Sequence, residues 1–184
     1  MTKTVYLMAA ALFMLLSSCS KSEYRKSLTE ADSIASVNPQ RAMAMLDSMK
    51  QEMAGAPEHE QMYYKLLCIK APDKAYIKHT SDSMILKLVE YYETEGDKKL
   101  LPEAYYYAGS VYRDLNDAPR ALKFYQKSEE TLPDNADLQD FSKLHNQKGT
   151  LFLFQYLNKE AIMQFKQAYI YESMKKDTTK MVYC

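Results

Sequence analysis

The stretch that most constrains the fold of this chain runs from residue 102 to residue 133 and reads PEAYYYAGSVYRDLNDAPRALKFYQKSEETLP. Apolar and small residues recur in it at steps of three and four positions, which is the spacing that gives a helix one apolar face. The spacing predicts two helices, over residues 103–115 and 118–131. Because the turn between them is short and polar, the two helices are expected to fold back on each other as an antiparallel pair.

Single residues predict both the turn and the helix contact of this pair. Asp117 is expected to cap the second helix by accepting a backbone N–H bond, and Pro119 lies in the first turn, where a missing N–H costs nothing. Gly109 and Ala121 carry little or no side chain, so the helices can approach closely there while tyrosines fill the flanking space. A large residue at either position should force the helices apart, at a cost of about 1 to 3 kcal/mol.

The pattern resembles the tetratricopeptide repeat, whose consensus of about 34 residues carries aromatic, small and proline residues at fixed positions. Three positions depart from that consensus: alanine replaces leucine, tyrosine replaces phenylalanine and serine replaces alanine, all tolerable by size. The resemblance implies an all-α fold, a right-handed superhelical solenoid of antiparallel helix pairs, whose concave face binds another polypeptide and holds no catalytic site. The residues that carry the resemblance are Tyr105, Ala108, Gly109, Tyr112, Ala121, Tyr125, Ser128 and Pro133.

Several of these markers recur further along the chain. Three of them share one offset of 40 residues, about six more than the usual period. A shared offset indicates a repeated unit. Together with the helical spacing of apolar residues in the rest of the chain, it predicts helix pairs at about residues 27–53, 57–96, 98–132 and 134–176. The recurring markers are Gly109 with Gly149, Ala121 with Ala161, and Tyr125 with Phe165, and Ala168 lies on the inner face of the last helix.

Breaker residues predict where the helices of the 57–96 pair end. Pro72 is expected to end or kink the first helix at about Ala71, because proline removes a backbone hydrogen bond and crowds the preceding turn. The connection that follows is longer than in the repeat consensus. The partner helix, residues 81–95, is expected to stop at Gly96 in a left-handed conformation.

Three further positions follow from the repeat pattern. Cys68 is expected to occupy the slot that Gly109 fills later, and Ile162 is expected on the inner face of the last pair. Asp177-Thr178-Thr179 is typical of a helix cap, so residues 178–184 are expected to begin a further helix. A solenoid normally closes with a polar capping helix, so this chain is expected to be the front part of a longer array.

The first residues, MTKTVYLMAAALFMLLSSCSKSEY, have the layout of a secretory signal. Lys3 supplies one early positive charge, and an apolar run from Val5 to Leu16 follows it. A helix needs about 20 apolar residues to span a bilayer, and this run is shorter. Residues 1–18 are therefore expected to form a signal helix that is cleaved from the mature protein.

Leu16-Ser17-Ser18-Cys19 resembles the lipobox of bacterial lipoproteins. The resemblance implies that the Cys19 sulfur takes a diacylglyceryl group and that, after cleavage, its amino group is acylated, as with palmitate. More than one acyl chain gives stable anchoring, since each buried CH₂ contributes about 0.8 kcal/mol. Residues 19–26 would then be the lipidated cysteine and a polar tether, and the non-acidic Ser20 implies sorting to the outer membrane. The alternative is an ordinary signal peptide that holds Cys19 by chance.

The sequence offers little for catalysis or for metal and cofactor binding. His59, His79 and His145 follow no ligand spacing such as HExxH, so no metal or cofactor is expected. No glycine-rich phosphate loop, nucleophile elbow or triad pattern occurs, so an enzyme is not expected. The 24 basic and 24 acidic residues balance, which removes the electrostatic case for nucleic acid.

In tetratricopeptide repeats, ligands are bound by residues on the groove side of the first helix of each pair. The resemblance therefore implies a candidate peptide groove on the helices of residues 103–115 and 134–156. For any one of these residues, the alternative is that it faces solvent or packs against the neighbouring pair. The candidate groove residues are Tyr106, Ser110, Arg113, Asn146, Thr150 and Leu153.

These features predict a membrane-anchored scaffold that mediates protein–protein interaction in the bacterial cell envelope. Similar repeat proteins serve as extracytoplasmic sensor arms ahead of a membrane helix and a cytoplasmic regulator, which is a longer version of the same hypothesis. The alternative is a nutrient-binding lipoprotein that captures glycans through helix pairs. Sugar platforms commonly use tryptophan faces, and this chain has no tryptophan, although its 16 tyrosines could substitute.

Overall fold

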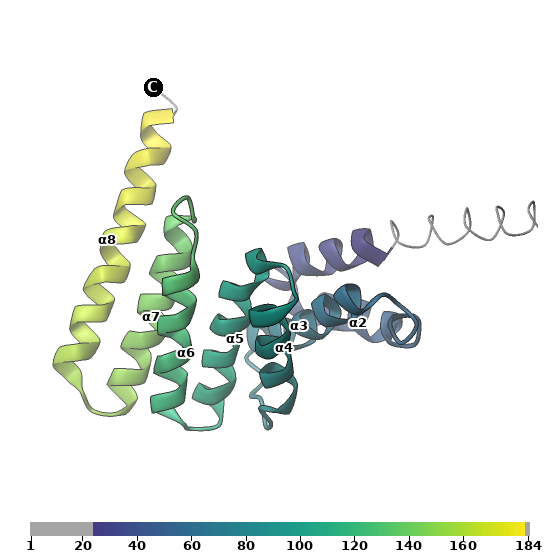
Figure 1. Ribbon diagram of the computed structural model, residues 1–184. Coiled ribbons are helices and arrows are strands. Elements are labelled where there is room, and N and C mark those ends of the chain that lie inside the picture. Colours follow the sequence, from purple (N-terminus) through teal and green to yellow (C-terminus); the bar gives the residue numbers. More distant parts are fainter. Residues whose placement is uncertain (1–23, 183–184) are drawn as a thin grey trace, which may run out of the picture. The chain divides into compact units, whose positions relative to one another are not determined.

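The computed structural model describes the backbone of residues 24–182 and the side chains of residues 24–176 (Figure 1). All regular elements in this part of the chain are helices, so the fold is all-α, as predicted. No helix among these residues is both long enough and apolar enough to cross a membrane. The proposed signal helix and Cys19 lie outside the described residues.

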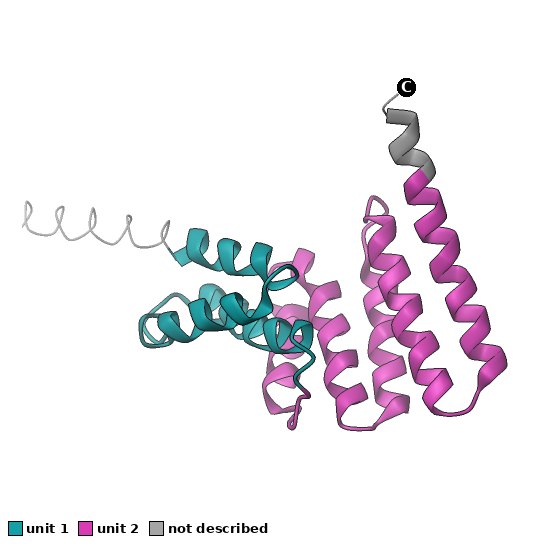
Figure 2. Cartoon of the chain, turned by 180° about the vertical axis from the view of Figure 1, so that it is seen from behind, with its two compact units in different colours: residues 1–77 teal, residues 78–184 magenta. Residues whose placement is uncertain are grey.

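The chain divides into two compact units, residues 1–77 and residues 78–184 (Figure 2). The boundary falls inside the helix pair predicted for residues 57–96, so that α3 (Glu58–Lys74) belongs to the first unit and α4 (Ser83–Thr94) to the second. A physical reason is the connection between them: residues 75–82 form no helix and are too many for the tight turn that joins the other pairs.

The first unit consists of a helix over residues 24–35, α2 (Pro39–Met53) and α3. Asn38 caps α2 by accepting a hydrogen bond from the backbone N–H of Arg41 at 3.1 Å, and Pro39 occupies the first turn. The predicted helix pair at residues 27–53 is therefore present. Apolar side chains of all three helices are buried, among them Leu28, Ala31, Leu46, Met53, Leu66 and Leu67.

Pro72 neither ends nor interrupts α3, which continues to Lys74. The prediction of a helix end at about Ala71 was wrong by one turn. The reason is local, because a proline removes only its own hydrogen bond. Beyond the proline, the N–H of Ala75 still bonds to the carbonyl of Ala71 at 3.0 Å and completes the last turn.

In the second unit, α4 and a 3₁₀ helix, η1 (Lys98–Leu100), precede two antiparallel hairpins (Figure 1). The first hairpin pairs α5 (Leu101–Asp114) with α6 (Ala118–Thr131), and the second pairs α7 (Leu138–Phe154) with α8 (Asn158–Val182). The two helices predicted from residues 102–133 are confirmed. Asp117 caps α6 as predicted, with its carboxylate accepting from the N–H of Arg120 at 3.0 Å.

Three helix ends share one turn geometry, and they are spaced 40 residues apart. Tyr76, Asn116 and Tyr156 have φ values of 59°, 61° and 58°, which is the left-handed region. After each of them, the next N–H bonds back across six residues: Ile77 to Pro72, Asp117 to Tyr112 and Leu157 to Phe152, all at 2.9 Å. This is the Schellman ending of a helix. It places Ile69, and not Cys68, at the position equivalent to Gly109.

Gly96 does not adopt the left-handed conformation that we predicted, since none of the glycines in the described residues has a positive φ. The glycine is required for space instead. A Cβ atom at this position would lie 2.5 Å from Cδ1 of Tyr92 and 2.8 Å from Cε1 of Tyr91. The absence of a side chain lets both rings fold over the end of α4.

The hairpins of the second unit pack closely at glycine, as predicted. A Cβ atom on Gly109 would overlap the ring of Tyr125 in α6, and a Cβ atom on Gly149 would lie 2.7 Å from Cε1 of Phe165 in α8. The two contacts join equivalent positions of α5–α6 and α7–α8. The small residues Ala121, Ser128, Ala161 and Ala168 are buried beside them, as are Tyr105, Ala108, Tyr112 and Tyr125, whereas Pro133 is exposed.

Two predictions for α8 were wrong. Ile162 is not on the inner face, because half of its surface (53%) is exposed. Its neighbour Ala161 faces α7 instead. The further helix expected from residue 178 is absent up to Val182, because α8 continues through this segment. No glycine or proline interrupts the sequence there, so Asp177 and the two threonines are accommodated within one helix.

Candidate functional site

The candidate groove residues lie on α5 and α7, but they differ in exposure. On α5, Tyr106 and Arg113 are half-buried, and Ser110 is fully buried with its hydroxyl 3.3 Å from that of Tyr125. Ser110 is therefore part of the packing between α5 and α6 and does not face a ligand. This placement removes one residue from the predicted groove.

On α7, the other three candidates form a row along one side of the helix, and two of them are exposed. Asn146 is exposed, and Thr150, one turn later, is half-buried and donates its hydroxyl to the Asn146 carbonyl at 2.9 Å. Leu153 exposes 48% of its surface. This row offers a side-chain amide and an apolar contact to solvent, so it remains available to a ligand.

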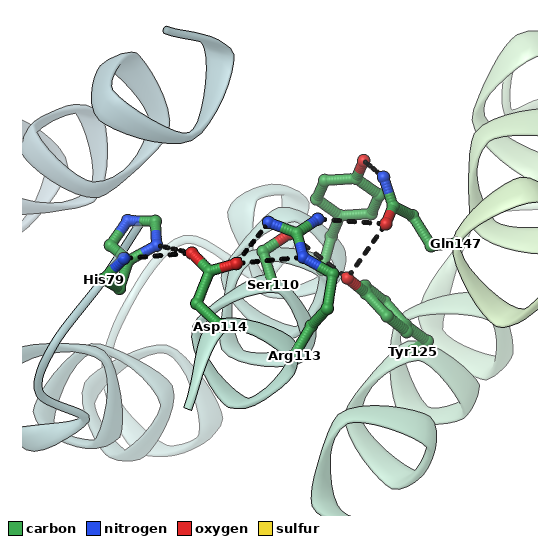
Figure 3. A network of polar contacts seen from close by, with 7 residues as sticks. His79, Ser110, Arg113, Asp114, Tyr125 and Gln147 are labelled. Atoms are coloured by element: carbon green, nitrogen blue, oxygen red, sulfur yellow. Dashed lines mark hydrogen bonds and ion pairs between the residues drawn. The ribbon is translucent and has the colours of Figure 1, made fainter. Parts of the chain in front are cut away.

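Arg113 is the centre of a polar network that joins α5 to its neighbours (Figure 3). Its Nε and Nη2 both donate to Oδ1 of Asp114, at 3.0 and 2.9 Å, and its Nη1 donates to Oε1 of Gln147 in α7 at 3.0 Å. These bonds hold the guanidinium in one orientation. The positive charge is largely balanced by Asp114, whose side chain is only 7% exposed.

Gln147 links the two hairpins of the second unit. Its Oε1 accepts from Arg113 and, at 3.4 Å, from the hydroxyl of Tyr125 (Figure 3). Its Nε2 donates to the hydroxyl of Tyr106 at 3.3 Å. One amide therefore joins two half-buried groove candidates, Tyr106 and Arg113, to the core tyrosine of α6. The sequence did not point to Gln147, because an isolated glutamine on a helix carries no pattern.

His79, in the segment before α4, closes the other end of the network (Figure 3). Its backbone N–H donates to Oδ2 of Asp114 at 3.0 Å, and its Nδ1 lies 2.8 Å from the same oxygen. Burial alone would raise the pKa of Asp114, but the hydrogen bonds from His79 and Arg113 outweigh it, so the pKa is lowered. Asp114 therefore stays ionised and fixes the segment before α4 against the end of α5.

A second ionic cluster holds α6, α7 and α8 together. Glu129 of α6 accepts from Nε2 of His145 at 3.1 Å and from the ammonium of Lys148, both on α7. The hydrogen bond from His145 and that from Lys148 exceed the opposing effect of burial and lower the pKa of Glu129 to about 2. Nδ1 of His145 lies 2.7 Å from Oε1 of Gln164 in α8. The cluster is structural, since Lys148 is buried.

The chemistry that these residues offer is hydrogen bonding and charge pairing. The only aliphatic hydroxyl in the polar network, that of Ser110, is buried against Tyr125 and has no access to a substrate. The surface of α5 and α7 instead presents a fixed guanidinium edge, a tyrosine, an amide and a leucine. Such a mixed surface suits a polypeptide, which brings backbone donors and acceptors as well as apolar side chains.

No protein-family model matches this chain, and no curated protein matches it, so its function must be argued from the residues and the fold.

Proposed function

We propose that this chain is a lipid-anchored scaffold of tetratricopeptide-like hairpins that binds another polypeptide in the bacterial cell envelope. The observation that carries the proposal is the glycine–aromatic contact, which recurs between α5 and α6 and between α7 and α8 at an offset of 40 residues. Hairpins that share one internal contact have similar shapes, and similar units are what a stacked repeat array requires. The right-handed solenoid expected from the sequence is the architecture that such stacking builds.

The binding surface in this proposal is the groove side of α5 and α7. Tyr106 and Arg113 are held in place by Gln147, and Asn146 and Leu153 extend the surface along α7. Side chains that are fixed before binding lose little entropy when a ligand arrives, which favours affinity. The partner is a peptide segment with at least one apolar side chain for Leu153 and polar backbone groups for the amide and the guanidinium edge.

The membrane anchor in this proposal is Cys19, supported by the apolar run and the small residues that precede it. Fatty-acid labelling of cells that express the full chain should label the wild type and not the Cys19→Ala variant, which should also leave the membrane fraction. Continued labelling of the variant would refute the anchor. Labelling of the variant would not contradict the peptide groove of α5 and α7, which is tested by a separate experiment.

Site-specific photo-crosslinking in cells tests the groove. A crosslinking amino acid at Asn146 should capture a polypeptide of defined mass, and the same group at Gln126, an exposed position on α6, should not. Leu153→Asp should abolish the product from Asn146 without changing the amount of folded protein. Equal products from Asn146 and Gln126, or a product that survives Leu153→Asp, would contradict the groove.

A further inference from the structure

The groove side of α5 and α7 carries charged side chains beside the candidate groove residues. Glu103 and Asp114 on α5 and Lys143 on α7 each lie three or four positions from one of those candidates, which places them on the same side of the helix. Arg113 is itself a candidate, and Asp140 lies one turn before Lys143. These five side chains comprise three acids and two bases, and the way they pair decides which ligand charge the groove accepts.

The guanidinium of Arg113 already has a carboxylate partner. A guanidinium binds a carboxylate best through two parallel N–H groups on one edge. Nε and Nη2, which form such an edge, both donate to Oδ1 of Asp114, and Nη1 donates to Oε1 of Gln147 (Figure 3). A ligand carboxylate would have to displace Asp114, whose side chain is only 7% exposed and also accepts from the backbone N–H of His79.

Lys143, the second base on this side, is paired within its own helix. Its ammonium donates to Oδ1 of Asp140 at 3.2 Å, and both side chains are 45% exposed. Opposite charges this close largely cancel each other at the distance of a ligand. Glu103, half-buried in the first turn of α5, leaves the acids in excess. The five side chains therefore hold no surplus positive charge with which to attract a carboxylate.

We infer that the groove binds an internal stretch of its partner that carries no carboxylate, and that Asp114 and Asp140 select against chain termini and acidic side chains. The inference rests on the proposed function, which supplies the groove, and adds the class of ligand. The groups that the groove does present suit such a stretch: the amide of Asn146 can bond to a peptide group, and Leu153 can contact an apolar side chain. A ligand carboxylate would be desolvated beside bases that are already paired, which costs affinity.

An array of random peptides tests the inference, with each peptide attached through its N-terminus and made once with a free C-terminal carboxylate and once with a C-terminal amide. The probe is the labelled full chain, purified in detergent, and the groove binders are the peptides that its Leu153→Asp variant no longer binds. Each groove binder should bind at least as tightly in its amide form. A glutamate in place of a glutamine within the bound stretch should weaken binding about tenfold.

Asp140→Asn tests whether the paired charges cause this selection. The substitution leaves the ammonium of Lys143 without its carboxylate, so the penalty for a glutamate in the peptide should fall severalfold. The pair is exposed, and such pairs contribute little to stability, so the helical spectrum should not change. The matched control is Glu130→Gln, at an exposed position on α6, which changes the net charge equally and should leave the penalty as it is in the wild type.

Two results would overturn the inference and leave the proposed function intact. One is a set of groove binders that require the free C-terminal carboxylate, because the groove would then bind polypeptide by its terminus. The other is a glutamate penalty that is equal in the wild type and in Asp140→Asn. An array on which Leu153→Asp loses no binder would instead contradict the peptide groove, and with it the proposed function.

Discussion

Glu129→Gln is expected to destabilise the second unit strongly, because it removes the carboxylate that pairs with the buried Lys148. The Lys148 side chain is 9% exposed and its ammonium donates to the Glu129 carboxylate, which is itself 27% exposed. Removing one partner of a fully buried ion pair costs about 3 to 5 kcal/mol. Since Glu129 is partly solvated, we expect a loss of about 2 to 3 kcal/mol, after discounting for screening by water.

A double-mutant cycle separates the cost of the orphaned charge from the value of the pair. Lys148→Met removes the buried ammonium and keeps its length, and Glu129 retains His145 as a donor, so this variant should lose about 1 kcal/mol or less. In the Lys148→Met background, Glu129→Gln should be nearly neutral, which corresponds to a coupling of about 2 to 3 kcal/mol. Urea unfolding followed by circular dichroism measures all four proteins, with the exposed Glu130→Gln as control.

The pH dependence of the same cluster has a definite sign. The pKa of Glu129 is lowered from 4.5 to about 2 in the folded protein, so the carboxylate contributes its full stability at pH values above 4.5. That contribution is lost as the pH falls from 4.5 towards 2. The Glu129→Gln variant should therefore lose less stability over this interval than the wild type. Two results would contradict the role of this cluster. One is a Glu129→Gln variant as stable as the wild type at neutral pH, and the other is a Glu129→Gln substitution that costs the same free energy of unfolding in the wild type and in the Lys148→Met background.

Four further substitutions test the turns that end α5 and α7. Tyr156→Gly should raise the melting temperature, because a left-handed conformation costs a non-glycine residue about 1 to 2 kcal/mol. Asn116→Gly should change the melting temperature little, since asparagine tolerates that conformation. A lower melting temperature for Tyr156→Gly would contradict the strain at this residue. Asp117→Ala should destabilise the protein by about 1 kcal/mol through loss of the cap on α6, and Asp117→Asn, which keeps the acceptor oxygen, should restore most of it. An alanine variant as stable as the wild type in urea would show that this cap is dispensable.

The helices and the closest contacts were predictable from the sequence because they depend on local patterns. Gly109 and Ala121 mark a close approach by their size, and Asp117 marks a cap by its place before Pro119. The spacing of apolar residues then gave α5 and α6 to within two residues of their observed ends. These features are encoded by neighbours in the sequence, where steric and hydrogen-bonding preferences act directly.

The polar site was predictable only in part, because it depends on which helices meet. Arg113 could be assigned to the groove side of α5, but its hydrogen bond to Gln147, 34 residues away, follows from the packing of α7 against the first hairpin. The burial of Ser110 likewise follows from the position of the Tyr125 ring. The left-handed conformation at Tyr156 ran against residue preference, and only the bonds of the surrounding turn impose it.

The most direct test of the account is the stability of glycine-to-alanine variants at the repeated contact. Gly109→Ala should lower the melting temperature by several degrees, because the Tyr125 ring that the new Cβ atom would meet is completely buried and cannot move aside. Overpacking of this kind costs about 1 to 3 kcal/mol, which exceeds the roughly 1 kcal/mol that alanine gains over glycine in helix propensity. Gly149→Ala should show a smaller loss, because Phe165 is only partly buried. Gly55→Ala, where a Cβ atom meets nothing closer than 3.9 Å, is the control and should not lower it. Melting curves in which all three variants match the wild type would contradict the claim that repeated close-packed hairpins build this protein.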